Sequence, residues 1–203
     1  MVFDILSRRD KDREQWGDRL PPGQKVAKDW PVLTYGGTPR VKLEDWRFRV
    51  FGLVEEELEW NWEQFTALPR TKVHTDIHCV TTWSKMDTNF EGLSIKDLMT
   101  HIQPKPEARA VMAHCYGGYT TNLTLDDFLH EDNLLAHIYE GEPLPSEHGG
   151  PCRLFVPHLY FWKSAKWVRG LQLMERDEPG FWELRGYHDR GDPWREQRYT
   201  NDP

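Results

Sequence analysis

The cysteine in TDIHCVTTWSK (residues 75–85) is the first side chain in this sequence that could do chemistry. Cys79 directly follows His78, and hydroxyl side chains come after it. A cysteine thiolate can be a nucleophile or a ligand for a soft metal. A core thiol is the third possibility, because free cysteine is among the most buried residue types. The stretch alone leaves all three roles open.

Histidines near the cysteines raise the possibility of a zinc or thiol enzyme. His74, His78, Cys79, His114 and Cys115 offer the ligand types that zinc uses. In a strand, however, His74 and His78 share one face and Cys79 lies on the other, so the three cannot meet one ion without a bend. The same geometry makes His78 a poor base for Cys79. A zinc or thiol enzyme built on Cys79, His78 and His114 is therefore an alternative rather than the main prediction.

A basic cluster in HGGPCRLFVPHLYFWKSAKW (residues 148–167) predicts an anion-binding wall. His148, Arg153, Lys163 and Lys166 gather there, although the chain carries a formal net charge of −7. Arginine offers a planar fork for phosphate, and lysine offers a point charge. A soft thiolate together with such a wall is what a metal carried by an anionic organic cofactor would need.

These groups need a scaffold, and the sequence predicts a mixed α+β domain with short helices between strands. We expect a charged N-terminal arm or short surface helix over residues 1–25 and a single domain over residues 26–203. Alternation and β-branched residues predict strands, capping residues predict helices, and Gly and Pro make the last 25 or so residues loop-rich. Strands are expected at 46–52, 70–80, 108–115, 133–141, 152–157 and 166–174, and helices at 61–68, 94–102 and after Thr124.

Composition excludes several classes of function. The acidic balance argues against a general nucleic-acid binder. No stretch approaches the roughly 18 consecutive apolar residues of a membrane span, and the charged start of the chain lacks the apolar run of an export signal. Three cysteines without such a signal favour a reducing cytoplasm and free thiols. The oligomeric state is not fixed by the sequence, and a monomer is compatible with it.

Two motifs, taken together, resemble the sulfite oxidase family of molybdopterin enzymes, and above all its short bacterial members. Cys79-Val80-Thr81-Thr82-Trp83-Ser84 is similar to the metal-ligating cysteine and V-x-x-W-S of the branch that reduces methionine sulfoxide. HGGPCR from His148 and KSAKW from Lys163 are similar to the family's cofactor segment. The resemblance covers about residues 28–190.

The resemblance implies the sulfite oxidase fold, with coiled mixed sheets and short helices. It also implies a molybdenum cofactor, Mo-molybdopterin, whose metal is held by Cys79. Other positions follow from matching the motifs residue by residue. The implied cofactor contacts are His148, Arg153, Phe161, Trp162, Lys163 and Lys166, with Cys115 at the place of a family threonine and Trp30 and Val32 in the N-terminal contact segment.

One departure bears on the substrate. Sulfite-oxidising members carry arginine five places after the cysteine, where this chain has Ser84. We therefore predict oxygen-atom or two-electron transfer on a small sulfoxide-like or N-oxide-like substrate rather than on sulfite. A separate electron-transfer partner is implied, because no flavin, haem or iron–sulfur motif is visible. The alternative is a catalytically silent cofactor- or anion-binding module of the same fold.

Overall fold

Two β-sheets with short helices at their edges make up the body of the computed structural model, which describes residues 2–203, with side chains from Arg9 onward. The six-stranded sheet runs β1-β5-β8-β10, with β4 paired to β5 and β9 paired to β8. Its strands are β1 (Lys25–Val26), β4 (Thr71–Cys79), β5 (Trp83–Ser94), β8 (Leu134–Tyr139), β9 (Glu142–Pro143) and β10 (Arg153–Phe155).

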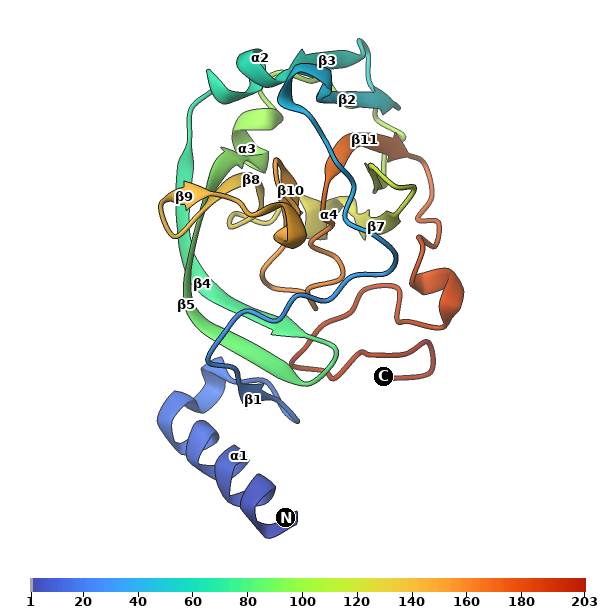
Figure 1. Cartoon of the computed structure of the whole chain (residues 1–203). Coiled ribbons are helices and arrows are strands. Elements are labelled where there is room, and N and C mark those ends of the chain that lie inside the picture. Colours follow the sequence, from blue (N-terminus) through green and yellow to red (C-terminus); the bar gives the residue numbers. More distant parts are fainter. Residues whose placement is uncertain (1) are drawn as a thin grey trace.

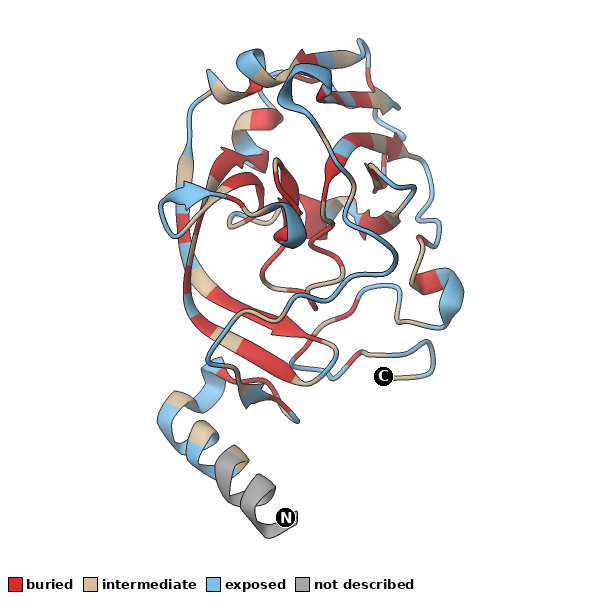
Figure 2. Cartoon of the chain, viewed as in Figure 1, coloured by how far each residue is buried: buried red, intermediate tan, exposed pale blue. Residues whose placement is uncertain are grey.

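The five-stranded sheet has the order β3-β2-β11-β6-β7, with β11 parallel to β2 and the other pairs antiparallel. The larger hydrophobic core draws on both sheets, and Figure 2 shows the buried residues concentrated where they face each other. The strands of this sheet are β2 (Arg47–Gly52), β3 (Leu58–Asn61), β6 (Ala110–Cys115), β7 (Thr120–Thr124) and β11 (Val168–Met174).

Three predicted helix starts are confirmed by their capping hydrogen bonds. Asn61 and Gln64 form a reciprocal capping box, while Ser94 and Thr124 each accept from the backbone amide three residues on. Each helix buries apolar residues in the larger core, and helices this short depend on such packing for their stability. They are α2 (Trp62–Thr66), α3 (Ile95–Leu98) and α4 (Leu125–Phe128); single 3₁₀ turns lie at Gly17–Arg19, Leu43–Asp45, Ser146–His148 and Glu183–Arg185.

The predicted N-terminal arm is only partly an arm. Helix α1 (Val2–Trp16) projects away from the body in Figure 1, but Leu20 and Gln24 are buried. Arg19 also donates two hydrogen bonds to Asp76 on β4, at 2.9 and 2.7 Å. The end of the predicted arm is therefore packed on the domain.

Strand β5 is the main element that the sequence did not predict. It is the longest strand and pairs with β1, β4 and β8. Its buried face includes Ser84, Thr88 and Gly92 as well as Phe90, so polar and small residues hide the apolar alternation. β5 and β4 form the long curved hairpin at the side of Figure 1, and the turn of this hairpin carries Cys79. The short strands β1, β3, β7 and β9 were also not predicted.

Among the described residues, no helix has the length and apolar character needed to cross a bilayer.

Candidate functional site

Cys79 opens onto a cavity of about 400 Å³ that the chain builds from separate segments. Most of the lining comes from the β4–β5 turn, from residues 30–35 of a strap formed by residues 30–43, from the basic segment 148–167, and from residues 181–187 near the C-terminus; Gly117 and Tyr119 come from the β6–β7 turn. The strap crosses the front of the body between β1 and β2 in Figure 1. Six of the predicted cofactor contacts line this cavity with Cys79: Trp30, His148, Arg153, Phe161, Trp162 and Lys166.

The Cys79 turn is held from both ends of the chain. Gln24 donates from Nε2 to the Cys79 carbonyl at 3.1 Å, and the Arg198 guanidinium donates to the Val80 carbonyl. Thr82 has a φ of 70°, which lets the chain reverse within three residues. The turn therefore has a fixed backbone, and it presents the sulfur to the cavity.

The Cys79 sulfur lies 3.1 Å from the Thr81 hydroxyl. Burial raises the pKa of the Cys79 thiol, while the Thr81 hydrogen bond and the charges of Arg198 and Lys166 act in the opposite direction. The net effect favours the thiol. Coordination of a metal ion is a physical means of holding such a buried sulfur as thiolate.

The histidines do not join Cys79. His78 lies on the other face of β4, where its Nδ1 is 2.8 Å from the Ser84 hydroxyl and its ring contacts Trp194. Burial lowers its pKa to about 4. His114 belongs to β6 in the other sheet and hydrogen bonds Gln172 at 3.0 Å. In the part of the chain that the structure describes, no three His, Cys, Asp or Glu side chains are placed to hold a metal, so the geometry does not support the zinc alternative.

Arg153 is a buried cation at the cavity wall. Its side chain is 1% exposed and donates to the carbonyls of His148, at 2.7 Å, and Ser164. The guanidinium also lies over the rings of Phe161 and Trp30, at 4.2 and 5.6 Å. No described carboxylate pairs with it, Nε has no partner, and burial lowers its pKa. A buried cation without a counter-charge is a site for an anion.

His148 and Lys166 extend this wall. The imidazole of His148 stacks on Trp30 with ring centroids 3.8 Å apart, and its buried Nδ1 has no partner. Burial, then the charges of Lys166 and Arg153, lower the pKa of His148 to about 4, so the ring is neutral at pH 7. Burial and Arg153 lower the pKa of the Lys166 ammonium to about 8. Gly149 is needed here, since its φ is 112° and a Cβ would meet Lys166 at 3.0 Å.

These residues fit the predicted cofactor on chemical grounds. The cavity brings together a thiol sulfur and polar groups that lack partners, among them His148 Nδ1 and the indole Nε1 of Trp83, beside the unpaired Nε of Arg153. Unsatisfied buried polar groups are rare in folded proteins and indicate a missing partner. An anionic organic group rich in hydrogen-bond acceptors would supply one.

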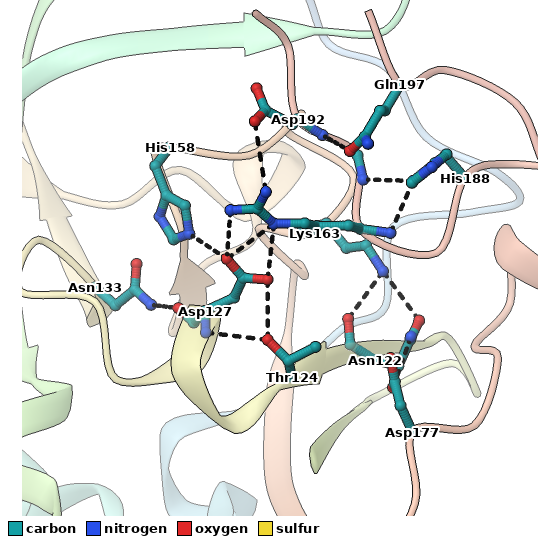
Figure 3. Close-up of polar contacts among 12 residues, drawn as sticks. Asn122, Thr124, Asp127, Asn133, His158, Lys163, Asp177, His188, Asp192 and Gln197 are labelled. Atoms are coloured by element: carbon teal, nitrogen blue, oxygen red, sulfur yellow. Dashed lines mark hydrogen bonds and ion pairs between the residues drawn. The ribbon is translucent and has the colours of Figure 1, made fainter. Parts of the chain in front are cut away.

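Three predicted contacts are not brought to the cavity. Lys163 is fully buried, and its ammonium lies 2.7 Å from a carboxylate oxygen of Glu183 and 2.9 Å from two oxygens of Asn122, the latter contacts drawn in Figure 3. The turn after Tyr160 directs this side chain into the protein. Cys115 belongs to the hydrophobic core, and the side chain of Val32 is 49% exposed between two lining residues. None of the three side chains lines the cavity of this structure, so their contact with the cofactor stays a prediction.

The mouth of the cavity was not predicted from the sequence. Tyr35, Phe181, Trp182 and Tyr187 form an aromatic rim, in which the ring centroids of Tyr35 and Trp182 lie 5.8 Å apart and those of Trp182 and Tyr187 4.9 Å apart. The run FWELRGYH, rich in aromatic residues within a predicted loop, was the available signal. Thr81, Trp83, Gly117 and Tyr119 are further lining residues that were not predicted.

Comparison with known proteins gives consistent matches. Residues 35–182 match the family described as oxidoreductase molybdopterin binding domain. The uncharacterized oxidoreductase YuiH of Bacillus subtilis (strain 168) is 48% identical over 185 residues, which cover 91% of this chain and 93% of YuiH. The protein-methionine-sulfoxide reductase catalytic subunit MsrP of Gluconobacter oxydans (strain 621H) is 26% identical over 68% of this chain and 49% of its own length.

Among solved structures, the sulfane dehydrogenase SoxCD from Paracoccus pantotrophus aligns with a TM-score of 0.64 and 24% identity. The alignment covers 70% of this chain and 41% of that chain. It confirms the predicted α+β fold class. This chain spans about half the length of MsrP and less than half of the aligned SoxCD chain.

Proposed function

We propose a function from the premise that this chain belongs to the oxidoreductase molybdopterin binding domain family, of the sulfite oxidase type. It is thus an oxidoreductase that uses a Mo-molybdopterin cofactor. The proposal is that Cys79 ligates the molybdenum and that the substrate is a small sulfoxide or N-oxide. One observation carries it: the Cys79 sulfur and an unneutralised basic wall face the same cavity.

When bound, the cofactor supplies two-electron, oxygen-atom transfer chemistry. The protein's own residues position it. Arg153 and Lys166 provide positive charge for the phosphate, and His148 offers a neutral ring nitrogen to the pterin. Trp30 packs flat on His148 and closes that side of the cavity. Reduction of a sulfoxide takes two electrons and two protons and releases one water, so the electrons come from a separate carrier.

The preference for a neutral oxide over sulfite rests on the cavity mouth. Among the described lining residues, Arg153 and Lys166 are the only charged ones, and the rim is aromatic. Ser84, at the position where sulfite-oxidising members have arginine, is fully buried beside His78 and does not line the cavity. The relative MsrP, named as a protein-methionine-sulfoxide reductase, supports the sulfoxide class. A cytoplasmic location and the identity of the electron carrier stay predictions.

The test is metal and pterin analysis of protein made in a host that synthesises molybdopterin. Wild-type protein is expected to carry molybdenum, and Cys79→Ser to lose most of it. Cys152→Ser is the matched control, because this thiol is fully buried in the core away from the cavity. Unchanged molybdenum in Cys79→Ser would contradict the ligand role.

The substrate class is tested with a reduced dye as electron donor and a panel containing dimethyl sulfoxide, pyridine N-oxide and sulfite. Reduction of either oxide is expected, with no oxidation of sulfite by the same protein under an oxidising dye. Bound cofactor without turnover of any of them would favour the silent binding module instead.

A further inference from the structure

A second cavity, of about 970 Å³, adjoins the chain segment that carries His148. It is lined by residues 38–43 of the strap, by Trp62 on α2, by Arg70 before β4, and by residues of β8, β9 and the 146–151 segment. The strap and the 146–151 segment thus line both cavities: residues 30–35 and His148 line the first, and residues 38–43 with Ser146, Gly150 and Pro151 line the second. None of the implied cofactor contacts is among its described lining residues.

The lining is cationic in an acidic protein. Arg40, Lys42 and Arg70 line this second cavity, and no Asp or Glu is among its described lining residues. Within the described chain, Arg40 and Arg70 make no side-chain hydrogen bond or ion pair, and Lys42 has one exposed contact of 3.4 Å with Glu44. Surface pairs of that kind contribute about 0–1 kcal/mol. Three positive charges here are therefore free to meet an anion.

A buried polar atom points to the same conclusion independently. His137 lines the second cavity and is 7% exposed, and its Nδ1 has no hydrogen-bond partner. The ring is held by edge-to-face contacts with Trp62 and Phe65, at 5.9 and 5.5 Å, so it cannot easily turn away. A buried nitrogen fixed in this way without a partner indicates that one is missing.

The remaining lining restricts the kind of ligand. Val41, Trp62, Ile138 and Pro143 offer an apolar surface with one aromatic ring. Ligand sites commonly combine such a surface with a few polar groups that fix orientation. A single carboxylate would leave two of the three cations uncompensated, whereas a phosphate ester carries a charge of about −1.5 to −2 near pH 7. The guanidinium forks also match phosphate oxygens.

We propose that the second cavity binds an organic phosphate, with the phosphate held by Arg40, Lys42 and Arg70 and an apolar or aromatic body lying along Trp62 and Ile138. This site is separate from the cofactor cavity and does not depend on the proposed reaction. Because both cavities share the strap and the 146–151 segment, a ligand here contacts segments that also line the cofactor cavity.

The test is calorimetric titration of the holoprotein with AMP, phenyl phosphate and pyrophosphate, with adenosine as the uncharged counterpart of AMP. We expect one site per chain for AMP or phenyl phosphate and at least tenfold weaker binding of adenosine. Arg40→Gln/Arg70→Gln should weaken phosphate binding at least tenfold and leave molybdenum content unchanged. His137→Phe, which keeps an aromatic ring but removes the nitrogens, should weaken it several-fold.

Arg176→Gln/Arg195→Gln is the matched control, since both arginines are exposed and make no hydrogen bond or ion pair with the described side chains. Binding in that variant should stay within twofold of wild type. The proposal is overturned if none of the three phosphates binds at millimolar concentration, or if the control pair loses binding equally. It is also overturned if Lys166→Gln abolishes binding while Arg40→Gln/Arg70→Gln does not, because the phosphate would then occupy the cofactor cavity.

Discussion

The two lysines of the KSAKW motif are predicted to have opposite roles, and Lys163→Met tests this. The Lys163 ammonium and the Glu183 carboxylate are both fully buried and lie 2.7 Å apart. Removing one partner of such a pair leaves an uncompensated buried charge, which costs about 3–5 kcal/mol. Glu183 keeps its hydrogen bonds from Thr121 and Trp162, at 3.0 and 2.9 Å, which places the expected loss at the lower end of that range.

The assay is urea unfolding at pH 7 for wild type, Lys163→Met, Glu183→Met and the double variant. The double variant removes both charges, so it should be at least about 2 kcal/mol more stable than the sum of the single losses predicts. In the folded fraction, Lys163→Met should retain molybdenum and pterin. Lys166→Met is the matched control and should show the reverse: less than about 1 kcal/mol of lost stability, since this side chain is half-buried at the cavity, but reduced cofactor content.

One result would refute the ion-pair role of Lys163. If Lys163→Met folds with wild-type stability and lacks cofactor, its ammonium reaches the cofactor and the pairing with Glu183 is not its role. Lys163 would then contact the cofactor, as the resemblance to the family implies, and its pairing with Glu183 would not be its main role.

Two further predictions concern pH. Burial and Arg153 lower the pKa of Lys166 to about 8, so its charge is present below pH 8 and lost above it, and retention of the phosphate-bearing cofactor should fall between pH 7 and pH 9. The Lys166→Arg variant keeps its charge and should flatten this pH profile. A profile that is the same in Lys166→Arg as in wild type would exclude Lys166 as the titrating group. Asp127 accepts a hydrogen bond from Thr124 and contacts His158, as Figure 3 shows, and it also accepts from Arg190. Burial raises the pKa of Asp127, but these contacts outweigh it and hold the pKa below the usual range. Because its folded pKa is the lower one, Asp127 should stabilise the protein above its unfolded pKa of about 4 and lose that contribution as the pH falls further. Asp127→Asn should therefore lower the free energy of unfolding by about 2–3 kcal/mol at pH 7 and by much less near pH 3, as measured by thermal or urea unfolding. An equal loss of stability at both pH values would contradict the stabilising role of the Asp127 charge.

Local features of the sequence were enough to place the helix starts and to single out His148, Arg153 and Lys166, which line one cavity. Asn61, Ser94 and Thr124 cap helices because a side-chain oxygen three residues before a backbone amide satisfies it whatever the rest of the fold does. Strand alternation also separated His78 from Cys79 correctly, since neighbouring residues in a strand point to opposite faces.

Tertiary structure alone decided which side chains of a motif reach the cavity. Lys163 and Lys166 are three residues apart and chemically equivalent, yet one pairs with Glu183 in the interior and the other faces the cofactor wall. The sequence could not separate them, because the partner carboxylate lies 20 residues away and is brought near only by the path of the C-terminal segment.

The same reason applies to the groups that come from distant parts of the chain. The sequence by itself singled out Cys79, the basic segment and the capping residues. The patterns that mark them extend over only a few neighbouring residues. Contacts between distant segments build the aromatic rim, the hold of Gln24 and Arg198 on the Cys79 turn, and the second cavity. Arg198 and Val80 are 118 residues apart, and Tyr35 and Trp182 are 147 residues apart. Such contacts depend on how strap, sheets and C-terminal segment pack together, so only the folded molecule decides them.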